Sequence, residues 1–478
     1  MLPLAPPSRP SPLRGVLALG LFLALTATNP WGVGHEEIWN APREWGMTLF
    51  TLATLIGVAS KKGSLQPTRR VLGGLLASAG FLVVGILSTL LSPQPIWSWT
   101  GYPSVGDGLR FWALGVAFAW AVYLALESGL LTFRLVQASL LAALALHALA
   151  IFPQAWDWKL DYTRTSGQTF VRCFDEARTI CREVPDATAS GIHRGQMPIG
   201  LTSHRGHAGG VLALLSLFAA GAYFLRASRW QLGVFALGAL ALWFTVTRGA
   251  WLALWVPLGL LALYGFRRSP GHAKRGLALL SVGLITYSLY LGATKVGLGE
   301  VRSFPEMGAS FSEANAYSSG RLELWSKGFA ALSLRPLWGW GFDGFARAYP
   351  YAVDWNQADR RLLPPPLEPP VHVVQGEDRL IYLEDAQGTR LLAPSPYAKA
   401  HNLPLDLLLS VGILGGLSYL LWLGLALACA TWSKMPLALM LVGYMLYGLT
   451  WYDSVHVTPL ALMATGALFA REEAWIKG

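Results

Sequence analysis

Charged residues are scarce in this chain of 478 residues. They make up 13% of it, and 53% of the residues are hydrophobic, whereas soluble globular proteins carry about 25% charged residues. The mean hydropathy is +0.42. The shortage of charge and the repeated long apolar runs exclude an ordinary soluble domain. They predict an all-α polytopic membrane protein, for which the lipid bilayer is a partner.

Cysteine is also rare. Cys429 lies in an apolar run and is expected to be a packing residue. Cys173 and Cys181 lie in a polar loop that we place outside the cytoplasm, where a disulfide persists. A bridge between them and two free thiols are both open alternatives. The chain has no CxxC, no HExxH and no His/Cys cluster with metal-ligand spacing, so we expect no metal and no other cofactor.

Twelve apolar runs are long enough to cross a hydrocarbon layer of about 30 Å. The first one also has the character of a signal-peptide core, but the topology is coherent if it is kept as a span. We expect spans at about 15–31, 45–60, 71–91, 111–126, 135–156, 207–225, 230–246, 249–266, 276–294, 403–432, 435–451 and 457–470.

The distribution of basic residues supports this order of spans. Short cytoplasmic connections of membrane proteins are enriched in Lys and Arg, so the net charge of +10 indicates topology and not nucleic-acid binding. The short connections predicted outside carry only Arg43, Arg110 and Arg248. Both termini are then cytoplasmic. The connections predicted inside carry Lys61, Lys62, Arg69, Arg70, Arg134, Arg226, Arg229, Arg267, Arg268, Lys274, Arg275 and Lys434.

The chain therefore divides into three regions. Residues 1–294 hold nine spans and a long outside loop at 157–206. Residues 295–402 form one long polar segment, which we call the lid. Residues 403–478 hold the last three spans and a cytoplasmic tail.

Two elements are expected within the lid. SGRLELWSKGFAALSL predicts an amphipathic helix, with its apolar face packed on the bundle. The alternating pattern of residues 371–393, with turn residues between the runs, predicts a small β-meander. The face expected to pack on the bundle consists of Leu322, Trp325, Phe329 and Leu332.

Three residues are candidates for chemistry. Arg248 lies in the tight connection of WFTVTRGAW, where a charge at the end of a span tends to be functional; the alternative is a side chain that reaches the lipid headgroups. Arg321 opens the lid helix, with a solvated surface position as its alternative. His401 precedes a span, where a neutral imidazole is placed to accept a proton; capping the span is the other interpretation.

Two further motifs have both a structural and a functional interpretation. GLTSHRGHAGG places His204, Arg205 and His207 at the outer start of a span, either as a polar helix start or as ligand-binding residues. GWGFDG, at 339–344, matches GxGxxG, but it follows a helix and a proline turn and not a strand. A dinucleotide site is therefore not expected there.

In this order, TVTRGAW, SSGRLELW with RPLWGWGFDGF, and AHNLPLDLLLSVGILGGL resemble the O-antigen ligase and polymerase superfamily of membrane glycosyltransferases. SHRGHAG also resembles the start of that family's sixth span. The resemblance covers about residues 190–460.

The resemblance implies transfer of a glycan from a polyprenyl-diphosphate carrier to a glycolipid or glycan acceptor at the periplasmic face of a bacterial inner membrane. It implies a metal-independent, inverting enzyme of the GT-C-like membrane type, and no DxD motif is present. Arg248 and Arg321 would hold the diphosphate, and His401 would take the acceptor's proton. His204, Arg205, His207 and Asn402 would contribute to substrate binding.

Several functions share this architecture. In some polymerases, an Arg in an outside loop is followed by Gly eleven residues later. The arginines considered in the outside loops of this chain do not have a Gly at that distance. Ligase is therefore expected ahead of polymerase or protein O-oligosaccharyltransferase. A secondary transporter is the alternative from another class, but its polar residues should lie near the middle of the membrane.

Overall fold

The structure is a computed structural model. It describes residues 12–32, 34–61, 66–102, 105–156, 163–173, 181–189, 198–300, 310–356, 366–393 and 398–472, with the backbone alone at 163–173 and 181–189.

Helices occupy all twelve predicted apolar runs. Seven of them are long and apolar enough to cross a membrane, namely α3, α5, α6, α7, α9, α10 and α14, and α1, α8 and α16 are shorter apolar helices. The number of spans therefore stays a prediction. The twelve are α1 (Pro12–Thr26), α2 (Ala41–Ala59), α3 (Arg69–Leu90), α5 (Leu109–Glu127), α6 (Phe133–Ala155), α7 (Arg205–Arg226), α8 (Arg229–Phe244), α9 (Arg248–Arg268), α10 (Pro270–Lys295), α14 (Leu403–Leu427), α15 (Met435–Gly448) and α16 (Thr458–Phe469).

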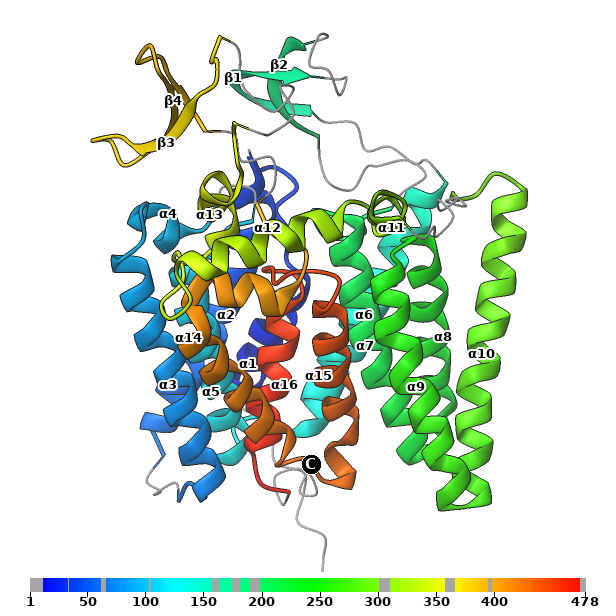
Figure 1. The fold of residues 1–478 in the computed structure, drawn as a ribbon. Coiled ribbons are helices and arrows are strands. Elements are labelled where there is room, and N and C mark those ends of the chain that lie inside the picture. Colours follow the sequence, from blue (N-terminus) through cyan, green and yellow to red (C-terminus); the bar gives the residue numbers. More distant parts are fainter. Residues whose placement is uncertain are drawn as a thin grey trace, which may run out of the picture.

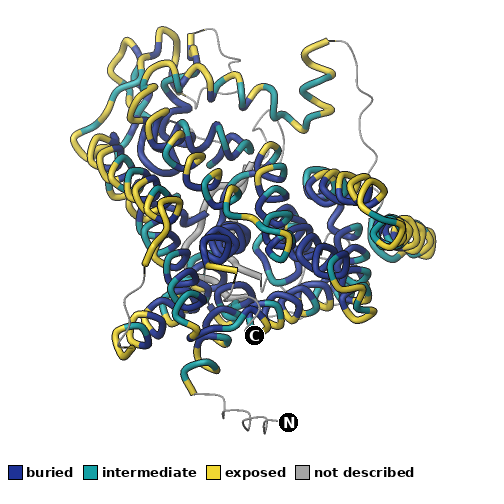
Figure 2. The backbone as a smooth tube through the Cα atoms, turned by 90° about the horizontal axis from the view of Figure 1, so that it is seen from below, coloured by how far each residue is buried: buried dark blue, intermediate teal, exposed yellow. Residues whose placement is uncertain are grey.

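The bundle has a buried centre and an apolar outer surface. Of the apolar window of α7, 94% is buried, whereas only 28% of that of α10 is buried. The outer helices turn their exposed faces away from the centre (Figure 2). Exposed leucines such as Leu76, Leu260 and Leu284 lie on those faces, which suits contact with lipid. Two basic residues, Arg226 at the end of α7 and Arg268 at the end of α9, lie at the end of the bundle opposite the lid.

The lid caps one end of the bundle (Figure 1). It contains α11 (Phe311–Tyr317), α12 (Arg321–Leu334), α13 (Gly344–Ala352) and a sheet. The sheet is the predicted meander, with β3 (Val371–Gln375), β4 (Ile381–Asp385) and β5 (Arg390–Leu392) paired in that order, all antiparallel. The sequence did not indicate α11 or α13.

A β-hairpin lies in the other long loop. Its strands are β1 (Thr163–Cys173) and β2 (Cys181–Ala189), which were not predicted. The strand register places Cys173 opposite Cys181. The disulfide between them stays a prediction, since only the backbone is described there.

Short elements complete the chain: a π-helical turn, η1 (Glu36–Asn40), the helix α4 (Pro95–Thr100), and a 3-10 turn, η2 (Trp432–Lys434).

The predicted packing face of α12 was right only in part: Trp325 and Leu332 pack against the buried cluster that includes Leu405 of α14, but Phe329 does not belong to this face. Leu324, Gly328 and Ala331 are the buried residues of this helix, whereas Phe329 is 61% exposed. Gly328 fits this face because a Cβ there would come within 2.7 Å of Leu405 in α14. Close contact with a neighbouring helix therefore decided the face, and small residues permit it where large apolar ones do not.

The GWGFDG segment docks on a break in α14. Gly412 has a φ of 66°, which interrupts the helix. At this break, Leu409 O accepts a hydrogen bond from Trp340 N at 2.7 Å, and Ser410 O accepts one from Gly341 N at 3.0 Å. Ile413 N donates to Pro336 O at 2.8 Å. The N–H groups of this glycine-rich segment are thus used within the protein, which agrees with a structural role.

We predict that Gly412→Ala destabilises the protein by about 2–4 kcal/mol. A Cβ at Gly412 would lie 2.1 Å from Leu337 O, and the positive φ disfavours alanine. Gly424→Ala in the same helix is the matched control, because a Cβ there has no neighbour within 4 Å. Thermal unfolding in detergent measures both. Equal melting temperatures for the two variants would contradict the proposed docking.

Candidate functional site

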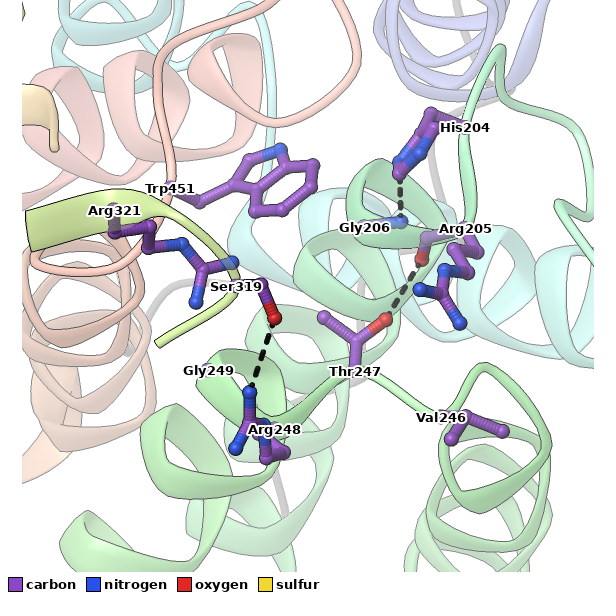
Figure 3. A pocket seen from close by; sticks show the side chains of 10 residues that line it. All are labelled: His204, Arg205, Gly206, Val246, Thr247, Arg248, Gly249, Ser319, Arg321 and Trp451. Atoms are coloured by element: carbon purple, nitrogen blue, oxygen red, sulfur yellow. Dashed lines mark hydrogen bonds between the residues drawn. The ribbon is translucent and has the colours of Figure 1, made fainter. Parts of the chain in front are cut away.

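A pocket opens where three helices begin under the lid (Figure 3). His204, Arg205 and Gly206 come from the start of α7, Val246 to Gly249 from the start of α9, and Ser319 and Arg321 from the start of α12, with Trp451 from the loop after α15. Its volume is about 370 Å³, including space open to solvent. Helix N-termini carry partial positive charge, so three of them with three arginines favour an anion.

Arg248 joins the membrane bundle to the lid. Its guanidinium donates to Tyr317 O at 2.8 Å and to Ser319 Oγ at 3.3 Å, and it lies 5.0 Å from the centre of the Tyr317 ring. In Figure 3, Arg205 and Arg321 extend toward the pocket from opposite sides. The predicted pair Arg248 and Arg321 therefore lines one cavity, although 73 positions separate them.

Trp451 connects the arginines to His401. The Arg321 guanidinium lies 5.7 Å from the indole, the His401 ring packs edge-on against it at 5.0 Å, and His204 stacks on it at 5.3 Å. His401 itself does not line the pocket, but its ring packs against Trp451, which does.

The environment of His401 fixes its protonation. Its Nδ1 lies 3.2 Å from Lys399 O, and because a carbonyl only accepts, Nδ1 carries the hydrogen and the lone pair lies on Nε2. Burial lowers the pKa of His401 to about 4, and the charges of Arg321 and Lys399 contribute. The ring is therefore neutral at pH 7.

The other predicted binding residues divide into two groups. His204 and Arg205 line the pocket. His207 is buried behind Trp451, where its Nδ1 lies 3.2 Å from Ser203 Oγ. Asn402 caps α14 by accepting from Leu405 N and donates to Leu449 O. These last two side chains do not line the pocket.

A buried ion cluster lies next to His401. Lys399 Nζ lies 2.5 Å from a carboxylate oxygen of Asp107, 2.5 Å from one of Asp343, and 3.4 Å from one of Asp453. Burial alone would lower the pKa of Lys399, but the three carboxylates raise it well above its ordinary value. The cluster joins the loop before α5, the lid and the loop before α16.

Arg347 of α13 completes the positive side of this cluster. It is 1% exposed, and none of its side-chain nitrogens has a hydrogen-bond partner among the described residues. Burial lowers its pKa to about 10, although Asp343 and Asp107 act in the opposite direction. Within the described ranges, no three His, Cys, Asp or Glu side chains are grouped to hold a metal ion.

Trp451, Lys399 and the buried histidine His456 were not predicted from the sequence as site residues. Arg43 was counted only for topology, yet it is buried and its Nη1 lies 2.5 Å from His456 Nδ1. One signal was available: WYDSVH, at 451–456, places several polar residues together between two apolar runs.

One family comparison covers part of this site. Residues 233–366 match the model of a family described as O-antigen ligase. The matched segment includes Arg248 and Arg321 and ends before His401. No curated protein is similar enough in sequence to match.

We predict that Lys399→Met destabilises the protein by about 3–5 kcal/mol, because it removes the cation that contacts three buried carboxylates. Burial and the neighbouring carboxylates already raise the pKa of Asp107. The charge of Lys399 lowers the pKa of both Asp107 and Asp343. Without Lys399 these folded-state pKa values rise, so the deficit should shrink as pH falls and grow as pH rises.

The matched control is Arg390→Met, which breaks an ion pair with Glu384 whose arginine is 57% exposed. That change should cost less than about 1 kcal/mol. Melting temperatures from pH 5 to pH 8 test both variants. A deficit for Lys399→Met that did not vary with pH would contradict the charge-burial explanation.

Proposed function

We propose that the chain is a member of the O-antigen ligase and polymerase superfamily, which the match over residues 233–366 supports, and that it transfers a glycan from a polyprenyl-diphosphate carrier to an acceptor hydroxyl. The reaction would take place at the periplasmic face of a bacterial inner membrane. The observation that carries the proposal is the pocket where Arg205, Arg248 and Arg321 meet at three helix N-termini.

This pocket suits a diphosphate. The planar guanidinium donates two parallel hydrogen bonds to phosphate oxygens, which a lysine cannot do. In the described structure Arg248 already binds the lid through Tyr317 O, and its charge lies beside that of Arg321 in the pocket. A diphosphate would neutralise this concentration of positive charge. The polyprenyl chain attached to the diphosphate would extend into the membrane along the bundle.

The transfer is a single displacement in this proposal. The acceptor oxygen attacks the anomeric carbon, and the bond from that carbon to the diphosphate oxygen breaks. The arginines stabilise the charge that develops on the diphosphate. The acceptor's proton passes to Nε2 of His401, which carries the lone pair. Because attack and departure occur on opposite faces, the configuration inverts.

The low pKa of His401 depends in part on the charge of Arg321. A bound diphosphate that compensates Arg321 would therefore raise this pKa toward the range of an effective base. Donor binding would thereby prepare the base.

Ligase activity is proposed ahead of polymerase and protein O-oligosaccharyltransferase activity. The support is the missing Arg-to-Gly spacing in the outside loops. The enzyme would be metal-independent and of the GT-C-like membrane type.

We predict that His401→Ala lowers the transfer rate by about 10²–10⁴-fold, with donor binding largely kept. Arg248→Lys should keep the fold but lower transfer by about tenfold or more, since it loses the bidentate fork. The assay is the amount of acceptor-linked and carrier-linked glycan in membranes of a complemented deletion strain.

The controls are His372→Ala, on the exposed face of β3, and Arg229→Lys, at the start of α8. Both should transfer normally. Near-normal transfer by folded, abundant His401→Ala protein would refute the assignment of the base.

The pH profile gives a separate prediction. A base with a pKa of about 4 stays neutral from pH 8 down to pH 5. The acid limb of kcat/KM, which reports the free enzyme, should therefore lie near pH 4 and not near 6.5. The limb of kcat should lie at higher pH, because it reports the donor complex. Coincident limbs near pH 6.5 would contradict this environment for His401.

A further inference from the structure

Two adjoining hollows lie at the other end of α12 from the arginine pocket. The first, of about 750 Å³ including space open to solvent, is bordered by Leu91, Arg335, Gln375 and Arg379 among others, and no acidic residue of the described ranges lines it. The second, of about 730 Å³ measured in the same way, is bordered by Leu334, Leu337 and Trp338. Both hollows share Leu91 and Arg335. One continuous surface therefore combines a cationic part and an apolar part.

The apolar hollow lies at the level where the bundle surface ends. Leu90 and Leu91, at the end of α3, are 68% and 58% exposed, in line with a position against lipid. Trp97 and Trp99 of α4, the helix that follows α3, are also exposed. Trp338 of the lid is exposed as well. Tryptophan is enriched at the boundary between hydrocarbon and headgroups. The cationic hollow is thus next to the headgroup layer.

Side-chain contacts hold Arg335, and backbone contacts hold the turn that carries Arg379. Arg335 donates to Leu91 O at 3.0 Å and lies 4.5 Å from the Trp340 ring. Arg379 lies in the β3–β4 turn with a φ of 64°, and Gln375 ties this strand to Pro93 O at 2.7 Å. The acidic residues of that turn, Glu377 and Asp378, do not line the hollow.

We propose that these hollows form one binding site for a lipid with a phosphate-bearing headgroup. The phosphate would lie between Arg335 and Arg379, and an acyl chain would lie along Leu91, Leu334 and Trp338. An amphipathic surface of this composition fits such a lipid on both counts, because guanidinium pairs with phosphate and the leucines match hydrocarbon.

This lipid is the acceptor, an inference that rests on the proposed function. The donor's diphosphate belongs to the pocket at the start of α12, and the lipid site lies at its end. The 14 residues of α12 separate the two by about 20 Å. A phosphorylated glycolipid whose sugars extend over that length would present a hydroxyl to His401 while it stays anchored in the membrane.

Photo-crosslinking tests the site without any need for activity. The full chain is placed in phosphatidylcholine nanodiscs that contain either phosphatidic acid or phosphatidylcholine with a diazirine acyl chain, and labelled peptides are mapped by mass spectrometry. Phosphatidic acid should label residues 90–91 and 334–338. The double variant Arg335→Gln/Arg379→Asn should lower that labelling by about tenfold or more. Asparagine is chosen because it tolerates the positive φ of Arg379.

Matched variants separate this site from the pocket. Arg390→Gln, in the same sheet, and Arg248→Gln should both keep the labelling. Equal labelling by the two lipids, or labelling that the double variant does not change, overturns the site. Competition by inorganic phosphate as strong as that by unlabelled phosphatidic acid would show a phosphate site and overturn the lipid assignment.

Transfer assays then test the acceptor role. In membranes of the complemented deletion strain, the double variant should accumulate carrier-linked glycan and lose acceptor-linked glycan. Normal transfer by the double variant with reduced labelling would assign the site to bulk anionic phospholipid and overturn the acceptor role. If His401→Ala transferred normally, the proposed function would fail while the labelling result stayed unaffected, so the two failures are distinguishable.

Discussion

The ammonium group of Lys399 is the point on which the arrangement of the lid depends. It is buried against carboxylates from the loop before α5, from the lid and from the loop before α16. Each of these charges is costly to bury alone, so the three segments are stable in this position only together. Lys399 also precedes His401 by two residues, and its carbonyl oxygen orients the imidazole. The ion cluster that holds the lid down therefore also positions the proposed base.

Interrupted and terminating helices provide the polar surfaces of this protein. A backbone in hydrocarbon must satisfy its own hydrogen bonds, so irregular segments are tolerated where protein covers them. The break at Gly412 of α14 is covered by the segment around Trp340. The starts of α7, α9 and α12 instead leave N–H groups and arginines around an open pocket. One kind of backbone feature thus serves attachment at one place and, in the proposed function, anion binding at another.

The helix α12 connects the two proposed substrate sites. Arg321, its first residue, lines the pocket, and Arg335, which follows its last residue, lines the hollows proposed to bind a lipid. Its buried residues, Leu324, Gly328 and Ala331, lie against α14 and α13, so both ends keep a fixed separation. A rigid element of this kind suits a reaction between two substrates that both remain anchored in the same membrane.

The sequence by itself determined the class of fold, the positions of the apolar helices and the β-meander, since these follow from hydrophobic periodicity and turn residues along the chain. It also singled out Arg248, Arg321 and His401, which the fold gathers around Trp451. Only the tertiary structure decided which face of α12 is buried, because this depends on how closely Leu405 approaches Gly328. The cluster of Lys399, Asp107, Asp343 and Asp453 was likewise decided there. Its members are scattered along the chain, and Coulomb attraction between buried charges depends on distance in space and not on separation in sequence.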